Sequence, residues 1–314
     1  MATLTTTRIL ADIAAAIVVE APILGRVASE FTSEPLKKGQ TAIAHIAKAP
    51  NVEAYDDTEG YGKNAQESNT LVEDVPIVID NHKHVPIKVS YLQSLQDNKT
   101  VYQSAITHAA QALGKHIVDD GLAKVLAANF SKSTTEVIAD TDRDTLGKVR
   151  KAMNVAGAST MGRTAIVNSD FYEALDADPR IASRDYHGQQ TGASSLGRLV
   201  NVAGFEEVLE YPDFPSNGEN LTGFAMDPRA MSIKTGLPDD IEAIREGVGA
   251  PQIANFETIT DPDTGLSLLG IHWQVPGTFH VYMTVTLLWG WAIGKQGGAA
   301  DSKVDKCGHR IVTA

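Results

Sequence analysis

One long stretch of alternating residues constrains the fold of this chain more than any other feature. Between residues 75 and 89 the apolar side chains stand at odd positions: Val75, Ile77, Ile79, Val85, Ile87 and Val89. On an extended chain they share one face. A single strand of about 15 residues would span ~50 Å, whereas strands in compact domains usually have about 3–10 residues. The stretch therefore predicts either a strand that breaks near 81–83 or one that projects beyond its domain.

A second alternating segment offers a partner for this stretch. Residues 39–50, GQTAIAHIAKAP, alternate well enough to form a strand. Residues 51–70, between the two segments, are polar, acidic and punctuated by glycine, which is typical of a loop. Together these segments predict a long β-hairpin that protrudes from the body. A protruding arm orders backbone without burying much of it, so we expect neighbouring copies of the chain to cover it.

Helical periodicity dominates three other segments. Residues 97–130 are predicted to be a long helix, because apolar residues recur at i, i+4 and i+7 and Asp97 is a suitable N-cap. Residues 142–157 predict a second helix. Residues 8–19 predict a short helix within an N-terminal arm rather than a separate globular unit.

The last third of the chain is expected to be rich in strands. Residues 198–215 alternate as one strand, with Gly204 as a bulge or a close contact. Residues 254–277 predict a hairpin, and 280–294 predict a strand whose tryptophans pack in the core. The chain after residue 295 is small and polar and is expected to be a tail. The fold class is α+β.

Composition narrows the possible functions. The 314 residues carry a formal net charge of −12, and 43% of them are hydrophobic, as in ordinary globular proteins. A free-standing nucleic-acid-binding protein is usually basic, so we expect no such role, although a wall that only encloses nucleic acid needs no basic surface. Cys307 is the only cysteine, which excludes an internal disulfide. Asp12 and Glu20 interrupt the apolar N-terminal run, so neither a signal peptide nor a membrane span is predicted.

Asp80, His82 and His84 are the strongest candidates for chemistry. They stand at alternate positions and so share one face of an extended chain, and His45 on the partner strand is a further candidate. Zinc or iron sites usually need three protein ligands with supporting contacts. No second cluster completes such a set, so we favour cross-strand or inter-chain contacts. A metal-dependent enzyme using these three residues is kept as an alternative; otherwise we expect no enzyme and no cofactor.

Four segments, taken in order, resemble the major capsid (coat) proteins of tailed bacteriophages, which share the Hong Kong 97-type capsid fold. They are VPIVIDNHKHVPIKVSYLQSLQ (75–96), VNSDFYEALDADPRI (167–181), LGRLVNVAGFEEVLEYPDFP (196–215) and LTGFAMDPRAMSIKTGLP (221–238). Each segment alone is a weak signal, and none is a catalytic signature. Their order and spacing make the match moderately specific.

The resemblance implies a division of the chain into the family's parts. These are an N-terminal arm (1–37), an extended E-loop hairpin that lies across an adjacent subunit (38–92), a P-domain with a spine helix at 97–130 (93–160), an A-domain around the five- and six-fold axes (161–249), a return to the P-domain (250–295) and a C-terminal tail (296–314).

The resemblance also implies contacts and partners. We expect inter-subunit contacts at Glu59, Tyr61, Lys63, Asn64, Glu67, Asp80, His82, His84, Arg184, Asp185 and His187. Some family members cross-link a lysine to an asparagine of a neighbour, and Lys63 and Asn64 are of suitable types. About 37 residues precede the E-loop, which leaves no room for a long fused scaffolding segment and implies a separate scaffolding protein. A portal is a further expected partner, and a decoration protein is an optional one.

The leading hypothesis is structural. Hexamers and pentamers of the chain would tile an icosahedral virion shell that encloses double-stranded DNA without sequence-specific binding and is assembled in the host cytoplasm. An encapsulin-like nanocompartment shell with the same fold is the alternative. In a shell of this fold, Asp80, His82 and His84 would lie where the arm joins its own body or meets another copy. Their titration near neutral pH would then tune assembly.

Overall fold

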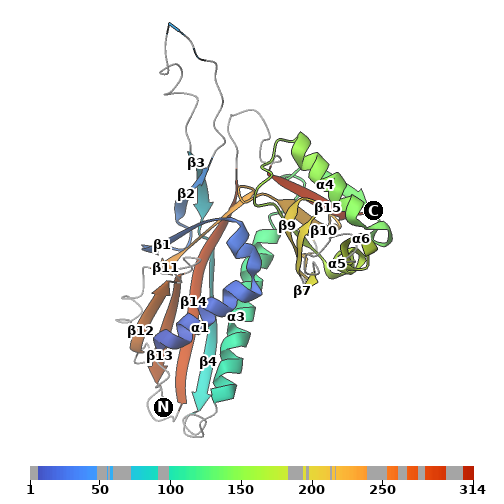
Figure 1. The fold of residues 1–314 in the computed structure, drawn as a ribbon. Coiled ribbons are helices and arrows are strands. Elements are labelled where there is room, and N and C mark those ends of the chain that lie inside the picture. The colour runs from blue at the N-terminus through green and yellow to red at the C-terminus, as the bar shows by residue number, and fades with distance from the viewer. Residues whose placement is uncertain are drawn as a thin grey trace.

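A computed structural model describes residues 6–47, 55, 57–58, 72–90, 99–182, 194–195, 198–212, 214–215, 217–238, 253–260, 267–274, 280–294 and 307–314. The described chain forms two bodies, each built around a β-sheet, and a hairpin that projects from the first body (Figure 1). Within these ranges no helix is both long and apolar enough to cross a membrane.

The first body is a six-stranded sheet covered by helices. Its elements are α1 (Thr6–Glu20), η1 (Pro22–Arg26), β1 (Ala28–Leu36), β4 (Asn81–Ser90), α3 (Lys99–Leu122), β11 (Met231–Pro238), β12 (Ile253–Thr260), β13 (Ser267–Gln274) and β14 (His280–Ile293). The strand order is β1-β11-β14-β13-β12, and β4 also pairs with β14. The hairpin consists of β2 (Thr41–Ala47) and β3 (Val72–Val78).

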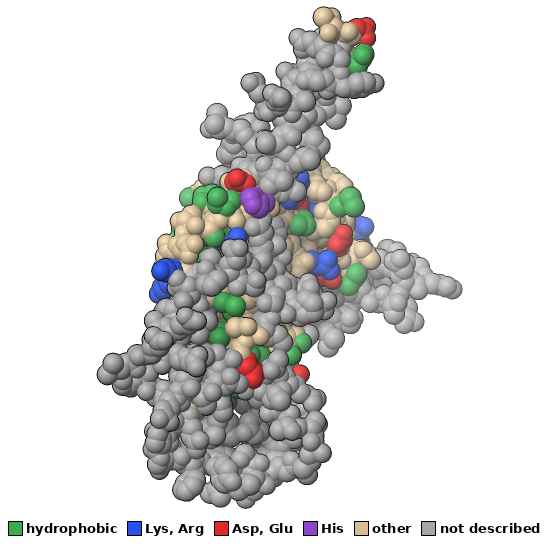
Figure 2. Space-filling view, turned by 90° about the vertical axis from the view of Figure 1, so that its left-hand side faces the viewer, with side chains coloured by type: hydrophobic (Ala, Val, Ile, Leu, Met, Phe, Trp, Pro, Cys, Tyr) green, Lys and Arg blue, Asp and Glu red, His purple; other side chains and the backbone are tan. Residues whose placement is uncertain are grey.

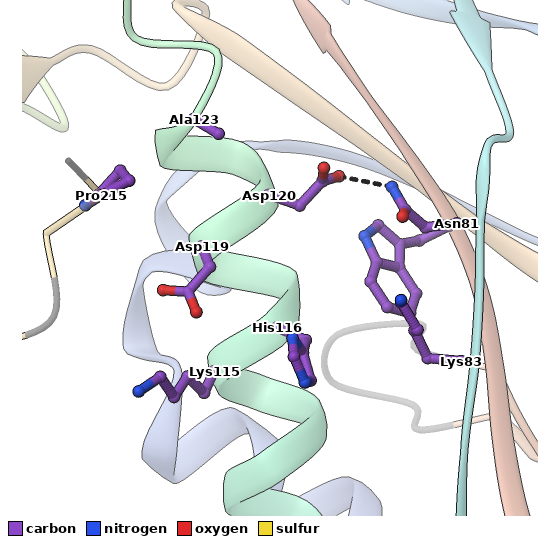
Figure 3. Close-up of a pocket in the computed structure, with 9 residues that line it drawn as sticks. Asn81, Lys83, Lys115, His116, Asp119, Asp120, Ala123 and Pro215 are labelled. Atoms are coloured by element: carbon purple, nitrogen blue, oxygen red, sulfur yellow. Dashed lines mark hydrogen bonds between the residues drawn. The ribbon is translucent and has the colours of Figure 1, made fainter. Parts of the chain in front are cut away.

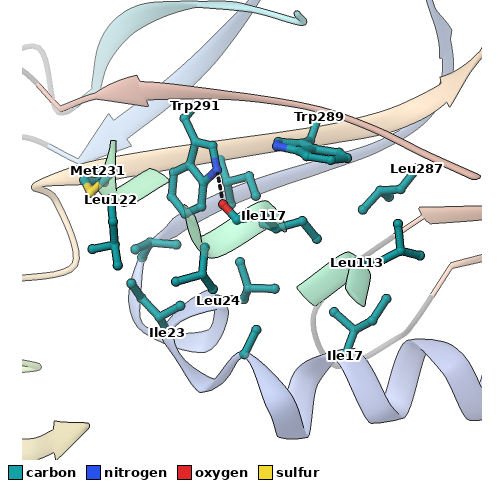
Figure 4. Close-up of a cluster of buried hydrophobic side chains, with 14 of the residues drawn as sticks. Ile17, Ile23, Leu24, Leu113, Ile117, Leu122, Met231, Leu287, Trp289 and Trp291 are labelled. Atoms are coloured by element: carbon teal, nitrogen blue, oxygen red, sulfur yellow. Dashed lines mark hydrogen bonds between the residues drawn. The ribbon is translucent and has the colours of Figure 1, made fainter. Parts of the chain in front are cut away.

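The main hydrophobic core lies between this sheet and helices α1 and α3 (Figure 4). Ile17 of α1 and Ile117 of α3 are fully buried, and Trp289 and Trp291 of β14 pack against them from the sheet. The indole N–H of Trp291 donates to the carbonyl oxygen of Ile117 at 3.0 Å. The predicted core strand at 280–294 is confirmed, and so is the core role of its tryptophans.

The short helix predicted at 8–19 is confirmed as α1, whereas the long helix ends earlier than predicted. The apolar stripe of α1 is buried in the main core of its own chain, so this segment is part of the body. Helix α3 ends at Leu122 rather than at residue 130, because the chain then turns to place Val125 and Phe130 in the core. The N–H of Val125 donates to the carbonyl oxygen of Leu122, a three-residue turn that stops the helix. The predicted cap at Asp97 lies outside the described residues.

The second body is built on a seven-stranded sheet. Its elements are β5 (Ser133–Glu136), η2 (Ile138–Asp140), α4 (Arg143–Val155), β6 (Thr164–Val167), α5 (Ser169–Asp176), α6 (Pro179–Ala182), β7 (Ser194–Ser195), β8 (Arg198–Val202), β9 (Phe205–Glu210), β10 (Leu221–Met226) and β15 (Gly308–Thr313). The strand order is β5-β15-β10-β6-β9-β8-β7.

Two expectations in this body are wrong. The predicted C-terminal tail contains β15, which lies between β5 and β10, with Ile311 fully buried. Residues 198–215 are not one strand: β8 and β9 form a hairpin in which Ala203 and Gly204 make the turn, with φ of 51° and 90°. Positive φ at both central residues is the geometry that suits two-residue hairpins. The helix predicted at 142–157 is confirmed, and Asp142 caps it.

Ionic contacts join the two bodies. Arg26 of the first body contacts Glu207 of β9, with Nη2 at 2.6 Å from Oε1. The chain crosses between the sheets at Asp227, which is fully buried and lies 2.6 Å from Nη2 of Arg229. The N–H of Ser159 also donates to Oδ2 of Asp227 at 3.1 Å, which ties a loop of the second body to this crossing.

The long alternating stretch is divided between the hairpin and the sheet. It breaks at residues 79–80, so β3 and β4 are separate strands. β3 pairs with β2, whereas β4 pairs with β14 along its whole length. Of the two predicted alternatives, the broken strand is confirmed, with the break at 79–80 instead of 81–83, and the predicted hairpin is confirmed by the pairing of β2 with β3.

Candidate functional site

The projecting hairpin has two different faces. On the inner face, Ala42, Ala44 and Ile77 are buried. On the outer face, Ile43 and Val78 are 50% and 49% exposed. Figure 2 shows hydrophobic side chains gathered with a histidine and an acidic side chain below the grey end of the arm. Apolar side chains on a projecting element are typical of a surface that another protein covers.

The inner face rests on β14 of the main sheet. Its apolar side chains form a small cluster with Leu288. At Gly290 the two backbones approach so closely that an added Cβ would lie 2.3 Å from the carbonyl oxygen of Val78. Only glycine allows such an approach. Nζ of Lys234 also donates to the carbonyl oxygen of Ile43 at 2.9 Å, so the base of the hairpin is fixed to the sheet on two sides.

A short hydrogen-bonded chain links the junction of β3 and β4 to α3. Nδ2 of Asn81 donates to Oδ1 of Asp80 at 2.9 Å. It also donates to Oδ2 of Asp120 at 2.8 Å (Figure 3). One amide therefore bridges two carboxylates, one at the end of the arm and one on the helix.

Asp120 titrates differently from an exposed aspartate. Burial raises the pKa of its carboxyl group, Lys124 opposes that shift, and the negative charge of Asp80 adds to it. The hydrogen bond from Asn81 favours the charged form and so lowers the pKa, but the net direction is upward.

A cavity of about 470 Å³ lies beside this junction (Figure 3). It is lined by Asn81, Lys83, Lys115, His116, Asp119, Asp120, Ala123, Pro215 and Trp289. Both signs of charge are present, and Asp119 accepts a hydrogen bond from the hydroxyl of Tyr211. The described residues contain no group of three or more His, Cys, Asp or Glu side chains that could hold a metal ion.

The three residues that suggested a metal site have other contacts. Asp80, His82 and His84 are all exposed, but Asp80 accepts from Asn81, and Nε2 of His82 lies 2.8 Å from Oγ1 of Thr286. His45 does not face them: its Nδ1 lies 2.7 Å from Oδ1 of Asp74, across the hairpin.

The other predicted contact residues lie outside the described part of the chain. These are Glu59, Tyr61, Lys63, Asn64 and Glu67 in the arm loop, and Arg184, Asp185 and His187 in the segment after α6. The described residues reveal a junction that the sequence interpretation missed, at Asn81, Asp120 and Gly290. Asn81 and Lys83, which interrupt the apolar alternation, were the available signal. Nothing in the sequence links them to Asp120.

Comparison with protein families gives one match. A model described as "Phage capsid protein" matches residues 87–281, which is more than half of the chain. No curated protein matches this chain.

Comparison with solved structures gives many matches, and three of them, all distant in sequence, follow. The capsid of Ralstonia phage GP4 is 9% identical with a TM-score of 0.53, over 91% of this chain and 86% of that chain. A structure of Microbacterium phage Oxtober96 is 12% identical with a TM-score of 0.50, over 94% and 91%. A virus-like particle from Pyrococcus furiosus is 12% identical with a TM-score of 0.51, over 96% of both chains.

The likeness to these solved structures indicates the fold of the chain, whereas the family match indicates the role of the protein. The architecture of two bodies, a projecting hairpin and a long helix is the Hong Kong 97-type capsid fold. The matched segment includes helix α3, strands β11, β12 and β13 of the main sheet, and the strands of the second sheet other than β15. The chain belongs to the phage capsid protein family and is a structural major capsid protein.

Proposed function

We propose that hexamers and pentamers of this chain tile a closed icosahedral shell around double-stranded phage DNA. The observation that carries the proposal is the projecting hairpin, whose outer face leaves Ile43 and Val78 half exposed. A closed shell repeats the same contact between every pair of neighbours, so an apolar arm face has a partner in each copy. The net charge of −12 keeps the wall from holding packaged DNA tightly.

The proposal includes the division of the chain into capsid parts. Residues 38–92 serve as the E-loop and lie across an adjacent subunit, and residues 161–249 form the A-domain that gathers around the symmetry axes. Residues 93–160 and 250–295 serve as the P-domain, with α3 in its spine helix. The tight seat of the hairpin at Gly290 supports this, because an arm that reaches a neighbour needs a fixed base.

The contact residues of the proposal fall into three groups. The arm-loop group is Glu59, Tyr61, Lys63, Asn64 and Glu67, the junction group is Asp80, His82 and His84, and the third group is Arg184, Asp185 and His187. If Lys63 of one copy bonds covalently to Asn64 of another, a ladder survives boiling on denaturing gels. A single band at 33.5 kDa ends that idea. If the histidines tune assembly, shell yield differs between about pH 5.5 and about pH 8.

The remaining partners are a separate scaffolding protein, a portal and, on some shells, a decoration protein. Assembly takes place in the host cytoplasm and the product is the virion capsid. Expression of the chain without scaffolding is expected to give misassembled particles; uniform, correctly closed shells from the chain alone would refute the need for it.

The deciding measurement is the size and content of the purified assembly. Electron microscopy and light scattering are expected to show closed particles in the MDa range that protect double-stranded DNA from nuclease. A stable small oligomer would overturn the proposal. Closed particles that hold a cargo enzyme instead of DNA would indicate a nanocompartment shell.

A further inference from the structure

Two polar residues take the place of apolar ones on the inner side of β4. Asn81 and Lys83 stand at odd positions, in phase with Val85 and Ile87, which pack against the main core. Side chains two residues apart share one face of a strand, so Asn81 and Lys83 face α3 at the edge of that core. Both line the cavity of about 470 Å³ beside the junction (Figure 3). Polar residues at positions that face a core are expected where a site has a function.

Trp289 of β14 gives this cavity a buried hydrogen-bond donor. It stands opposite Asn81 in the ladder between β4 and β14, it lines the cavity, and only 1% of its surface is exposed. Its indole N–H has no hydrogen-bond partner in the described part of the chain. A buried donor without an acceptor costs free energy, and such groups in native proteins call for an explanation. An acceptor atom of a ligand in the cavity supplies one.

Lys83 and His116 add two more donors from opposite sides of the cavity. Lys83 reaches from β4, and His116 reaches from α3, toward the space between the strand and the helix (Figure 3). Both residues are exposed, and neither side chain has a hydrogen bond, an ion pair or a ring contact with the described residues. Three donors from three elements, counting Trp289, therefore line one cavity, and Lys83 adds positive charge.

The two carboxylates of the cavity already have partners. Asp119 accepts a hydrogen bond from the hydroxyl of Tyr211, and Asp120 accepts one from Asn81. Two lysines also line the cavity, so a cation would meet positive charge beside carboxylates that are already hydrogen-bonded. The unused capacity of the described lining is that of donors. Charge-assisted hydrogen bonds from N–H groups are the contacts that suit an oxyanion, such as a carboxylate or a phosphate.

The cavity lies where the two bodies meet, and its rim is held in place. Pro215, between β9 and β10 of the second body, forms part of the lining. On one side of it Tyr211 donates to Asp119, and on the other side Nδ2 of Asn217 donates to the carbonyl oxygen of Val125 at 3.1 Å. Small-molecule sites commonly have about 300–1,000 Å³ and often lie between domains. The cavity is therefore larger than one oxyanion group needs, which leaves room for the rest of a small molecule.

A nucleic-acid backbone is a poorer match than a small molecule. Nucleic-acid-binding surfaces neutralise several phosphates at once, whereas this cavity combines two lysines with two aspartates on a chain of net charge −12. One oxyanion group needs only the three donors between β4, β14 and α3.

We infer that this cavity binds the phosphate or carboxylate group of a small molecule, with the indole N–H of Trp289, Nζ of Lys83 and the imidazole of His116 as donors. The bound group joins β4, β14 and α3, and the rest of the molecule extends toward Pro215 of the second body. The inference does not depend on the proposed function, because a single copy of the chain supplies every residue of the site.

Titration calorimetry of the purified chain with inorganic phosphate, glycerol phosphate and citrate, at constant ionic strength in chloride, measures the binding. Trp289→Phe keeps an aromatic ring but removes the donor, and Lys83→Gln removes the charge; each is expected to weaken binding of the preferred probe about tenfold. Lys88→Gln makes the same change at an exposed position of β4 outside the cavity lining and is the matched control. The three probes also show whether the site prefers phosphate or carboxylate groups.

Asp120→Asn tests the site in the opposite direction. The amide oxygen still accepts from Asn81, but the negative charge beside the bound group is gone, so the probe is expected to bind about fivefold more tightly. A damaged fold cannot produce this gain, so the test stands even if Trp289→Phe fails to fold.

Two results would overturn the inference. One is that none of the three probes binds, or that Lys83→Gln and Asp120→Asn leave their binding unchanged. The other is that a labelled single-stranded oligonucleotide binds in a Lys83-dependent way while the small probes do not, which would assign the donors to a nucleic-acid backbone. Either result leaves the proposed shell standing, since particle size and content are measured separately.

Discussion

β3 and β4 come from one alternating stretch of sequence, but they pair with different strands and cover different cores. In β3, and in β4 from Val85 onward, the odd positions are the more buried ones and the even positions are exposed. β4 pairs with β14 and belongs to the main sheet, over a core formed with two helices. β3 pairs only with β2, and its inward face meets a small cluster around Leu288.

The difference between these strands shows what alternation determines and what it leaves open. A two-residue period fixes which side chains share a face, whichever strand becomes the partner. The partner depends on contacts far away in the sequence, such as Gly290 beneath Val78. Because the arm has the smaller core, we expect it to open separately from the body.

The largest predicted effect comes from two neighbouring leucines on β14. Leu287 points into the main core, and Leu288 points under the hairpin; their exposures are 0% and 1%. Leu287→Ala is expected to lower the free energy of unfolding of the body by about 2–5 kcal/mol. Leu288→Ala removes the same atoms but is expected to appear as local opening of the arm, with little change in Tm.

Hydrogen exchange and thermal unfolding, measured on both variants, separate these outcomes. Faster exchange confined to 41–47 and 72–78 in Leu288→Ala, with a clear fall of Tm only in Leu287→Ala, would support separate opening. Equal losses of Tm would show that arm and body unfold as one cooperative unit.

The second effect concerns the seat of the arm. Gly290→Ala places a Cβ against the backbone of Val78, which cannot move aside as a flexible side chain would. We expect a cost of about 1–3 kcal/mol from overpacking and a loss of closed particles, while the body stays folded. Gly147→Ala is the matched control, because a Cβ there meets nothing within 4 Å. Normal shell assembly by Gly290→Ala would show that the close approach is not required.

Much of the fold was predictable from local sequence pattern. Elements whose signal lies within a few residues were predicted, and those that depend on distant partners were not. The strand at 280–294 and the helix capped by Asp142 carry their signals within a few residues, as periodicity or as a cap. The C-terminal strand β15 carried almost none: six residues are stabilised as a strand only by pairing with β5 and β10. The turn at Ala203 and Gly204 was missed because alternation continues on both sides of it.

The candidate site was predictable only in part. The sequence indicated the arm, and it placed Asp80, His82 and His84 at its junction. It did not indicate Asp120, which lies 39 residues from Asn81 and meets it only through the packing of α3 beside β4. The stacking of Tyr282 on Trp273 was equally hidden, since it needs the register of β13 and β14 to bring the two rings together.

A smaller effect is expected from pH at the junction. The raised pKa of Asp120 means that its carboxyl binds a proton more tightly in the folded chain than in the unfolded one, where its ordinary value is 3.8. The free energy of unfolding contributed by this group therefore rises as pH falls through the raised pKa, and the gain is complete below 3.8. At neutral pH the charged form lowers stability.

Asp120→Asn tests this sign, because the amide stays neutral and still accepts from Asn81. The variant is expected to be more stable than the parent chain near pH 7, and the difference is expected to shrink toward pH 4. Urea unfolding across that range measures it, and Asp12→Asn on the exposed side of α1 is the matched control. A variant that loses stability at neutral pH would show that the negative charge of Asp120 supports the junction.

The smallest effect is expected on the outer face of the hairpin, at His45 and Asp74. Their side chains are 58% and 65% exposed, so water competes with this contact and its loss costs about 0.5 kcal/mol or less. His45→Ala, Asp74→Ala and the double variant, compared by hydrogen exchange at 41–47 and 72–78, measure the coupling within one copy. Local opening of the same size as in Leu288→Ala would mean that the polar outer pair, rather than the apolar inner cluster, holds the arm together. Unchanged exchange in the isolated chain with a lower yield of particles would instead place this pair at the contact with a neighbour, because a group that does nothing for its own fold affects assembly only through another copy.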